Sequence, residues 1–275
     1  MNTFKNIFRA QALLVALAFS FFVTGCGSDN ATGSGSGSGL GAGSGALFAA
    51  DGGGGNPATR LYTLSPISGA IATNIGPIGF AVTGLAIQPG TGTLYGSTGG
   101  NAPISPNSII TINKTTGAGK LLGATGLGGS VADLTFTSDG RLYGWSEDSD
   151  DLVTINPKTG VATVVASSTL GTSGSGLAAS STNVLFFTGD GATGDLRTVN
   201  RTTGLATVVA TMIGPVGGSA INALAFSGST LYGSRSARGG LGSATTLITI
   251  NTTTGAITSL GASVNDLDAI VFDKF

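Results

Sequence analysis

The chain has 275 residues, including 48 glycines, 8 prolines, one cysteine, one tryptophan and no histidine. The lack of histidine excludes Ser-His-Asp and Cys-His catalysis and histidine-based metal sites, and a single cysteine excludes an internal disulfide. Twelve basic residues against 13 acidic ones leave no basic field for a nucleic-acid backbone, while 41% hydrophobic residues suffice for a folded core.

Residues 1–25 have the features of a lipoprotein signal peptide. Lys5 and Arg9 precede an uncharged run over 10–23, which is shorter than the ~20 residues that span a bilayer. The run ends in Val23-Thr24-Gly25-Cys26, which resembles the bacterial lipobox. The resemblance implies acylation of Cys26 and a lipid-anchored place in the cell envelope. Because Gly27 rather than Asp follows, it also implies the outer membrane if the cell has two membranes. An ordinary signal peptide with an incidental cysteine is the alternative.

Residues 26–45 are dominated by alternating glycine and serine. Side chains of this kind bury too little apolar area to offset the entropy of ordering the chain. We expect a flexible tether with a reach of about 25 Å.

From residue 46 onward the chain repeats itself. A turn of the form Asn-x-x-Thr-Gly occurs at 113–117, 156–160, 200–204 and 251–255, with a weaker copy at 65–69. A Leu-Tyr-Gly motif occurs at 94–96, 142–144 and 231–233, with variants at 47–49 and 185–187. A Leu-Ala-Phe-like motif precedes it at 84–87, 133–136, 176–179, 223–226 and 269–272. The turn glycines are spaced 48, 43, 44 and 51 residues apart.

Each repeat contains four short segments with the period-2 alternation of strands, separated by turn residues. Four antiparallel strands per ~45 residues are typical of propeller blades, whereas immunoglobulin-like sandwiches need ~100 residues and β-helix coils ~20. The motifs resemble bacterial β-propellers of the NHL and YVTN kind, and more loosely the quinoprotein-dehydrogenase-like propellers. The resemblance covers residues 46–275 and implies a binding or scaffold domain.

The ends of the repeat predict how the ring closes. The domain begins with a second strand at 46–50 and ends with a first strand at 269–273. One blade must therefore combine the C-terminal strand with three N-terminal strands, which removes the open edge of a solenoid. Five copies of each motif predict an all-β, five-bladed propeller of four-stranded antiparallel blades; six or seven blades would require a degenerate copy.

Polar residues stand one or two positions before each predicted inner strand and should ring the mouth of the central channel. They are Thr83, Asp133, Ser175, Asn222 and Asp268. One hypothesis is a site for an ion or a small polar ligand, and the alternative is a set of polar caps where water enters. Asp133 and Asp268 also suggest an acid/base pair for glycoside chemistry, which needs two carboxyl groups at a defined separation.

The links between second and third strands, and between fourth and first strands, vary in length and share one face, which makes this face the candidate binding surface. It carries an acidic loop containing Glu147, Asp148, Asp150 and Asp151. Oxygen ligands of this kind suit Ca²⁺, but the later Gly and Glu of an EF-hand loop do not follow, so a solvated loop is the alternative. No other cofactor is expected.

These features predict an envelope lipoprotein that presents a non-enzymatic propeller as a binding or assembly platform. Its partners would be the lipid bilayer, through acylated Cys26, and a protein or glycan on the variable-loop face, but not nucleic acid. A carbohydrate-active hydrolase or lyase using Asp133 and Asp268, or a purely structural surface protein, are the alternatives.

Overall fold

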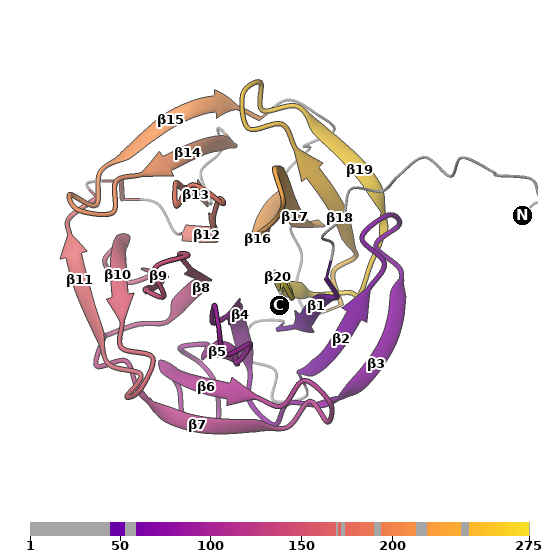
Figure 1. The fold of residues 1–275 in the computed structure, drawn as a ribbon, viewed down its shortest axis with the longest axis vertical. Coiled ribbons are helices and arrows are strands. Elements are labelled where there is room, and N and C mark those ends of the chain that lie inside the picture. Colours follow the sequence, from indigo (N-terminus) through magenta and orange to yellow (C-terminus); the bar gives the residue numbers. More distant parts are fainter. Residues whose placement is uncertain are drawn as a thin grey trace, which may run out of the picture. The chain divides into compact units, whose positions relative to one another are not determined.

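The computed structural model describes residues 45–52, 59–168, 170–171, 174–189, 194–212, 219–237 and 242–274. The described residues contain twenty strands in five sheets of four. The sheets stand around a common axis as the blades of a propeller, with one strand of each blade at the centre (Figure 1). The predicted five-bladed β-propeller is therefore confirmed. Residues 1–25, Cys26 and most of the predicted tether lie outside the described residues.

In four blades the strands follow the chain from the axis to the rim. Blade 1 contains β4 (Val82–Ile87), β5 (Leu94–Thr98), β6 (Ser108–Ile112) and β7 (Gly119–Ala124). Blade 2 contains β8 (Val131–Phe136), β9 (Leu142–Ser146), β10 (Asp151–Ile155) and β11 (Ala162–Ala166). Blade 3 contains β12 (Gly174–Ala179), β13 (Leu185–Gly189), β14 (Asp195–Val199) and β15 (Ala206–Thr211). Blade 4 contains β16 (Ser219–Ser227), β17 (Thr230–Ala237), β18 (Thr245–Ile250) and β19 (Ile257–Ala262).

Blade 5 closes the ring by joining the two ends of the described chain. Its strands are, from the axis outward, β20 (Leu267–Phe272), β1 (Leu47–Asp51), β2 (Arg60–Leu64) and β3 (Ile71–Pro77). β20 and β1 pair antiparallel, with Leu47 opposite Phe272 and Phe48 opposite Val271. The predicted closure by three N-terminal strands and one C-terminal strand is thus confirmed.

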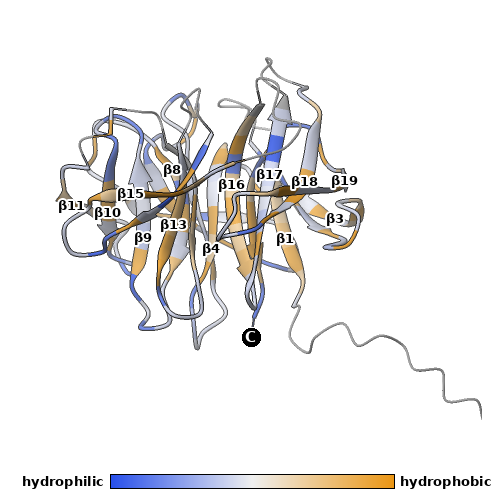
Figure 2. Cartoon of the chain, turned by 90° about the horizontal axis from the view of Figure 1, so that it is seen from above, coloured by the Kyte–Doolittle hydropathy of each residue, from blue (hydrophilic) through white to orange (hydrophobic). Residues whose placement is uncertain are grey.

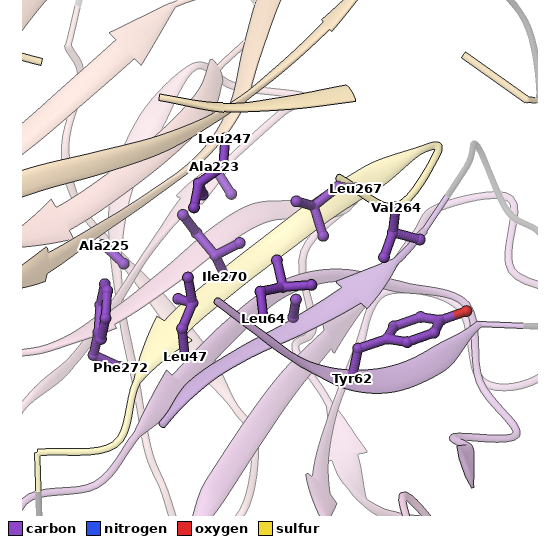
Figure 3. Packing of buried hydrophobic residues seen from close by; sticks show 11 residues of the cluster. Leu47, Tyr62, Leu64, Ala223, Ala225, Leu247, Val264, Leu267, Ile270 and Phe272 are labelled. Carbon is purple, nitrogen blue, oxygen red and sulfur yellow. The ribbon is translucent and has the colours of Figure 1, made fainter. Parts of the chain in front are cut away.

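The hydrophobic core is divided into five clusters, one between each pair of neighbouring blades. Successive side chains of a strand point to opposite faces of its sheet, and both faces of a blade meet a neighbour, so both need apolar residues. Figure 3 shows the cluster between blades 4 and 5, where Leu47 and Ile270 pack near Ala223 and Leu247.

Aromatic pairs repeat at the blade boundaries. An aromatic residue of the second strand meets a phenylalanine of the next blade between β5 and β8, β13 and β16, and β17 and β20. The ring centroids of Tyr95 and Phe136, and of Phe186 and Phe226, are each 5.4 Å apart in edge-on geometry. Trp145 stacks on Phe187 of the next blade, with centroids 3.9 Å apart. Such pairs add about 0.5–1.5 kcal/mol beyond the burial of their area.

The repeated turn joins the third and fourth strands of a blade. In blade 1 the Oδ1 of Asn113 accepts the amide N–H groups of Thr115 and Thr116 at 2.8 and 3.0 Å. Gly117 has φ 81°, and a Cβ there would lie 2.7 Å from the carbonyl oxygen of Gly76 in blade 5. The glycine is needed for its positive φ and for the close approach of the neighbouring blade.

The links between strands define two faces of the ring. We call the side with the first-to-second and third-to-fourth links the turn face, and the opposite side the loop face. The C-terminal end lies on the turn face, at the lower side of Figure 2. The chain enters β1 on the same face, because the amide of Asp273 donates to the carbonyl of Ala46 at 2.8 Å.

Candidate functional site

The five inner strands each carry one β-bulge near the loop face. The pairing register to the neighbouring strand skips Thr83 in β4, Ser175 in β12, Asn222 in β16 and Asp268 in β20. In β8 it skips from Val131 to Leu134, which places both Ala132 and Asp133 in the bulge. A bulge frees a residue from the ladder and re-aims its side chain. The five residues predicted to ring the channel mouth are therefore all bulge residues.

The predicted position of these residues before the strands was wrong, because the inner strands begin earlier and include them. The alternation of apolar and polar residues along each inner strand is interrupted at the bulge. The polar bulge residues were therefore interpreted as lying before the strand rather than within it. Ala132 occupies the position of Thr83 and Asn222 in the repeat, and Asp133 lies one residue further along. Asp133 consequently differs from the other four in its surroundings.

The carboxylate of Asp133 lies at the centre of the ring and is fully buried, with 0% exposure. Its Oδ1 accepts the amide N–H of Leu134 at 2.8 Å. Its Oδ2 accepts the amides of Leu177 in blade 3 at 2.9 Å and Leu224 in blade 4 at 3.2 Å. Burial raises the pKa of Asp133 well above its usual value, and the amides of these residues and of Leu85 in blade 1 oppose that rise.

These contacts have a physical reason in the architecture. The inner edge of each first strand has no further strand to pair with, so its buried amide groups need another acceptor. Leu134, Leu177 and Leu224 are equivalent positions of the repeat, and one carboxylate accepts amide hydrogen bonds from three different blades. Asp133 thus ties the inner strands together at the axis.

Small residues let the inner strands pack closely around Asp133. The positions equivalent to Asp133 in the other blades are Gly84, Gly176, Ala223 and Ala269. A Cβ built on Gly84 would lie 2.7 Å from the Cα of Asp133, and one on Gly176 would lie 2.7 Å from the Cγ of Leu224. A side chain at Gly84 or Gly176 would therefore collide with the neighbouring inner strand.

Three of the remaining bulge residues, Thr83, Asn222 and Asp268, are half-buried and form hydrogen bonds across blade boundaries. Thr83 Oγ1 donates to the carbonyl of Val131 in blade 2 at 2.8 Å. Asn222 Nδ2 donates to Asp268 Oδ1 in blade 5 at 3.0 Å, and also to Ser236 Oγ at 3.1 Å. The side chain of Ser175 lies outside the described residues. The structure thus pairs Asn222 with Asp268, and whether the rim binds an ion or ligand stays a prediction.

The predicted acidic loop on the loop face has its four acids in different surroundings. Glu147 and Asp148 are exposed, and Glu147 accepts a hydrogen bond from Ser130. Asp151 is buried and its Oδ1 accepts the amide of Ser168 at 2.7 Å. Burial and the neighbouring Asp151 raise the pKa of Asp150. Within the described residues no group of three or more acidic, histidine or cysteine side chains is placed to hold a metal ion.

An apolar pocket of about 340 Å³ opens on the axis at the turn face. Its lining includes Leu134 and Leu224, whose amides donate to Asp133, so the carboxylate lies behind its inner end. The last residues of the Leu-Ala-Phe motif line its wall; these are Ile87, Phe136, Ala179, Phe226 and Phe272.

The polar groups of this pocket are few. They include the hydroxyls of Ser138 and Ser180 and the ammonium of Lys274. Although Lys274 is exposed overall, neighbouring protein atoms reduce the hydration of its ammonium and lower its pKa. This pocket was not predicted from the sequence. The available signal was Ala179, the small residue at a position where the other four repeats have isoleucine or phenylalanine.

No protein-family model matches the sequence, and no curated protein matches it. Solved structures do resemble the fold. A chain in a nidogen/laminin complex superposes with a TM-score of 0.55 at 12% identity, over 84% of this chain and 98% of that one. A protein of unknown function from Bacteroides thetaiotaomicron gives 0.51 at 16% identity, over 68% of this chain and 53% of that one.

A gluconolactonase from Xanthomonas campestris gives a TM-score of 0.50 at 13% identity, over 79% of this chain and 77% of that one. At these identities the likeness concerns the fold alone. Among the described residues there is no helix with the length and apolar character needed to cross a membrane. The chain is a closed, five-bladed β-propeller whose axis is tied by a buried aspartate.

Proposed function

We propose that the chain is a lipid-anchored protein of the bacterial envelope that presents its propeller as a binding or assembly platform. The signal-like segment and the lipobox-like Val23-Thr24-Gly25-Cys26 support the anchor. The outer membrane is the favoured location in a cell with two membranes. The protein or glycan partner would bind the loop face, where the links of variable length lie.

The single observation that supports a non-enzymatic role is that the Asp133 carboxylate is buried and occupied by hydrogen bonds within the protein. Its carboxylate is fully buried and already accepts amides at 2.8–3.2 Å. A general acid or base must reach the atom whose proton it transfers. Asp133 is enclosed by the inner strands, so this geometry does not support its pairing with Asp268 in glycoside chemistry.

Two experiments test the proposal. In cells fed an alkyne-labelled palmitate, the wild-type protein should be labelled and a Cys26→Ser variant should not. A photo-crosslinking residue at Ser149 on the loop face should capture a discrete partner, while the same residue at Ser181 on the turn face should not. Capture from Ser181 alone would reject the loop face. Turnover of a glycan that is lost in Asp133→Asn would favour the enzyme, and no partner at all would favour a structural surface protein.

The turn-face pocket supports a second candidate function, the binding of a small amphipathic molecule. Its 340 Å³ lies at the lower end of the ~300–1,000 Å³ typical of small-molecule sites. The apolar wall and Lys274 would suit an apolar body with one anionic group. The fluorescence of anilinonaphthalene sulfonate should rise on binding to the protein, and Lys274→Gln should weaken that binding. Lys158→Gln is the control, since Lys158 is not among the residues that line this pocket; an equal effect would assign the dye to the surface.

A further inference from the structure

Basic and acidic residues are distributed unequally between the two faces of the ring. Among the described residues, six basic side chains lie on the turn face: Lys114, Lys120, Arg141, Lys158, Arg201 and Lys274. Two acids, Asp139 and Asp273, lie with them. The loop-face half has three described basic residues: Arg60, Arg197 and Arg235. Apart from the axial Asp133, it has eight described acids: Asp51, Glu147, Asp148, Asp150, Asp151, Asp195, Asp266 and Asp268.

The ring therefore has a positive turn face and a negative loop face, although the chain as a whole is almost neutral. The two turn-face acids partly offset this charge, since Asp273 pairs with Lys114 at 2.8 Å and Asp139 lies 3.5 Å from Arg201. Lys120 and Lys158 have no ion pair in the described structure. They are positioned to attract an anionic surface.

The turn face also exposes large apolar side chains beside these charges. Ile67, Val161, Val184 and Leu205 stand in or next to its turns with exposures of 64%, 52%, 41% and 52%. Of the described loop-face links, only the one containing Ile104 exposes a comparable side chain. Basic groups interspersed with apolar ones are the composition that binds at a lipid headgroup boundary.

The chain enters the propeller on this same face. Ala46, directly before β1, is hydrogen-bonded to Asp273 at the turn-face end of β20. A lipid anchor N-terminal to residue 45 would therefore be attached to the propeller at its basic face rather than at its acidic face.

We propose that the turn face of the propeller lies against a bilayer containing anionic phospholipids, so that the acidic loop face points away from the membrane. The inference rests on the proposed lipid anchor for its place in the cell, but its chemistry belongs to the propeller alone. Lysine and arginine near an anionic bilayer each strengthen binding about fivefold at moderate salt.

The test uses residues 45–275, which contain all twenty strands and all five apolar clusters and lack Cys26. Failure of acylation therefore cannot affect the result, and palmitate labelling tests the anchor separately. In a sedimentation assay, we expect vesicles of phosphatidylcholine with about one third phosphatidylglycerol to bind the domain roughly a hundredfold more tightly than pure phosphatidylcholine. Added salt should weaken the binding.

Matched variants locate the binding face. Lys120→Gln with Lys158→Gln removes two positive charges from the turn face and should weaken binding about thirtyfold. Asn101→Asp with Asn265→Asp changes the net charge equally, at exposed positions in two loop-face links, and should leave binding nearly unchanged. Equal losses in both variants would mean that net charge, rather than one face, drives binding, and would overturn the proposal.

Orientation is read directly from single labelled cysteines, because residues 45–275 contain no other thiol. A fluorophore on Thr203→Cys at the turn face should be quenched by nitroxide-labelled lipid headgroups, and one on Ser149→Cys at the loop face should not. The reverse pattern, or no binding to anionic vesicles, would refute the inference. Binding to a soluble polyanion such as heparin but not to vesicles would assign the face to an acidic polymer instead.

Discussion

Replacing Asp133 with alanine tests the role of the axial carboxylate. The substitution removes the acceptor of three amides, those of Leu134, Leu177 and Leu224. A buried donor left without a partner costs about 1–3 kcal/mol. Because water entering the vacated space would satisfy part of this loss, we expect the free energy of unfolding to fall by about 3–5 kcal/mol, a large part of the ~5–15 kcal/mol of a typical domain.

The assay is equilibrium unfolding in urea, followed by the fluorescence of Trp145. It is the single tryptophan and is fully buried between blades 2 and 3. Asp148→Ala on the exposed loop is the control and should change stability by less than about 0.5 kcal/mol. A change in Asp133→Ala no larger than in this control would show that the amides do not depend on the carboxylate.

The same site predicts a pH dependence. In the unfolded chain Asp133 should titrate near pH 3.9, whereas burial raises its pKa well above that value in the folded state. The folded protein therefore holds the proton between the two pKa values, so this contribution to stability is full below about pH 4 and is lost as pH rises through the folded pKa. Asp133→Asn has no such titration. The stability of wild type relative to this variant should fall with rising pH, and a constant difference would contradict the assignment.

Three further predictions concern the axis, the repeated turn and the end of β1. Gly176→Ala places a Cβ 2.7 Å from a side chain of the next blade and should lower stability by about 1–3 kcal/mol; Gly100→Ala, with its nearest contact at 3.3 Å, should change the melting temperature little. Asn251→Ala removes the acceptor of two turn amides at 2.9 Å and should cost about 1 kcal/mol in urea unfolding. Burial and Asp51 raise the pKa of Tyr62 to about 12, so ultraviolet titration should show a phenol that ionises near pH 12 and that ionises earlier in Asp51→Asn. The neutral form of Tyr62 supports folding up to about pH 10, and this support is lost as pH rises through about 12.

Much of the fold could be predicted because recurring turn motifs mark the ends of the strands in each repeat. The Asn-x-x-Thr-Gly turn supplies a side-chain acceptor and a positive-φ glycine at a fixed spacing, so the third and fourth strands of each blade follow from local chemistry. Blade closure followed from the order of motifs, since the repeat starts with a second strand and its last motif is a first strand.

The site was only partly predictable. The bulge residues were recognised as polar interruptions before apolar strands, and Asn222 and Asp268 do meet across a blade boundary. The special place of Asp133 was not recognised, although Gly84 and Gly176 stand at equivalent positions of the motif. A one-residue displacement within a bulge moves a side chain from the rim to the axis, and strand periodicity alone does not reveal which residue bulges.

The amino-acid sequence by itself determined the repeating unit, the number of blades and the pairing of the two chain ends, because these depend on short-range turn chemistry and on counting motifs. Only the tertiary structure decided that three blades direct amides toward one carboxylate, that a pocket opens behind it, and that basic and acidic residues predominate on opposite faces. The hydrogen bonds to Asp133 connect residues about 45 to 90 positions apart in the sequence. Such contacts, like the pocket and the two charged faces, form only once five sheets have closed around a common axis.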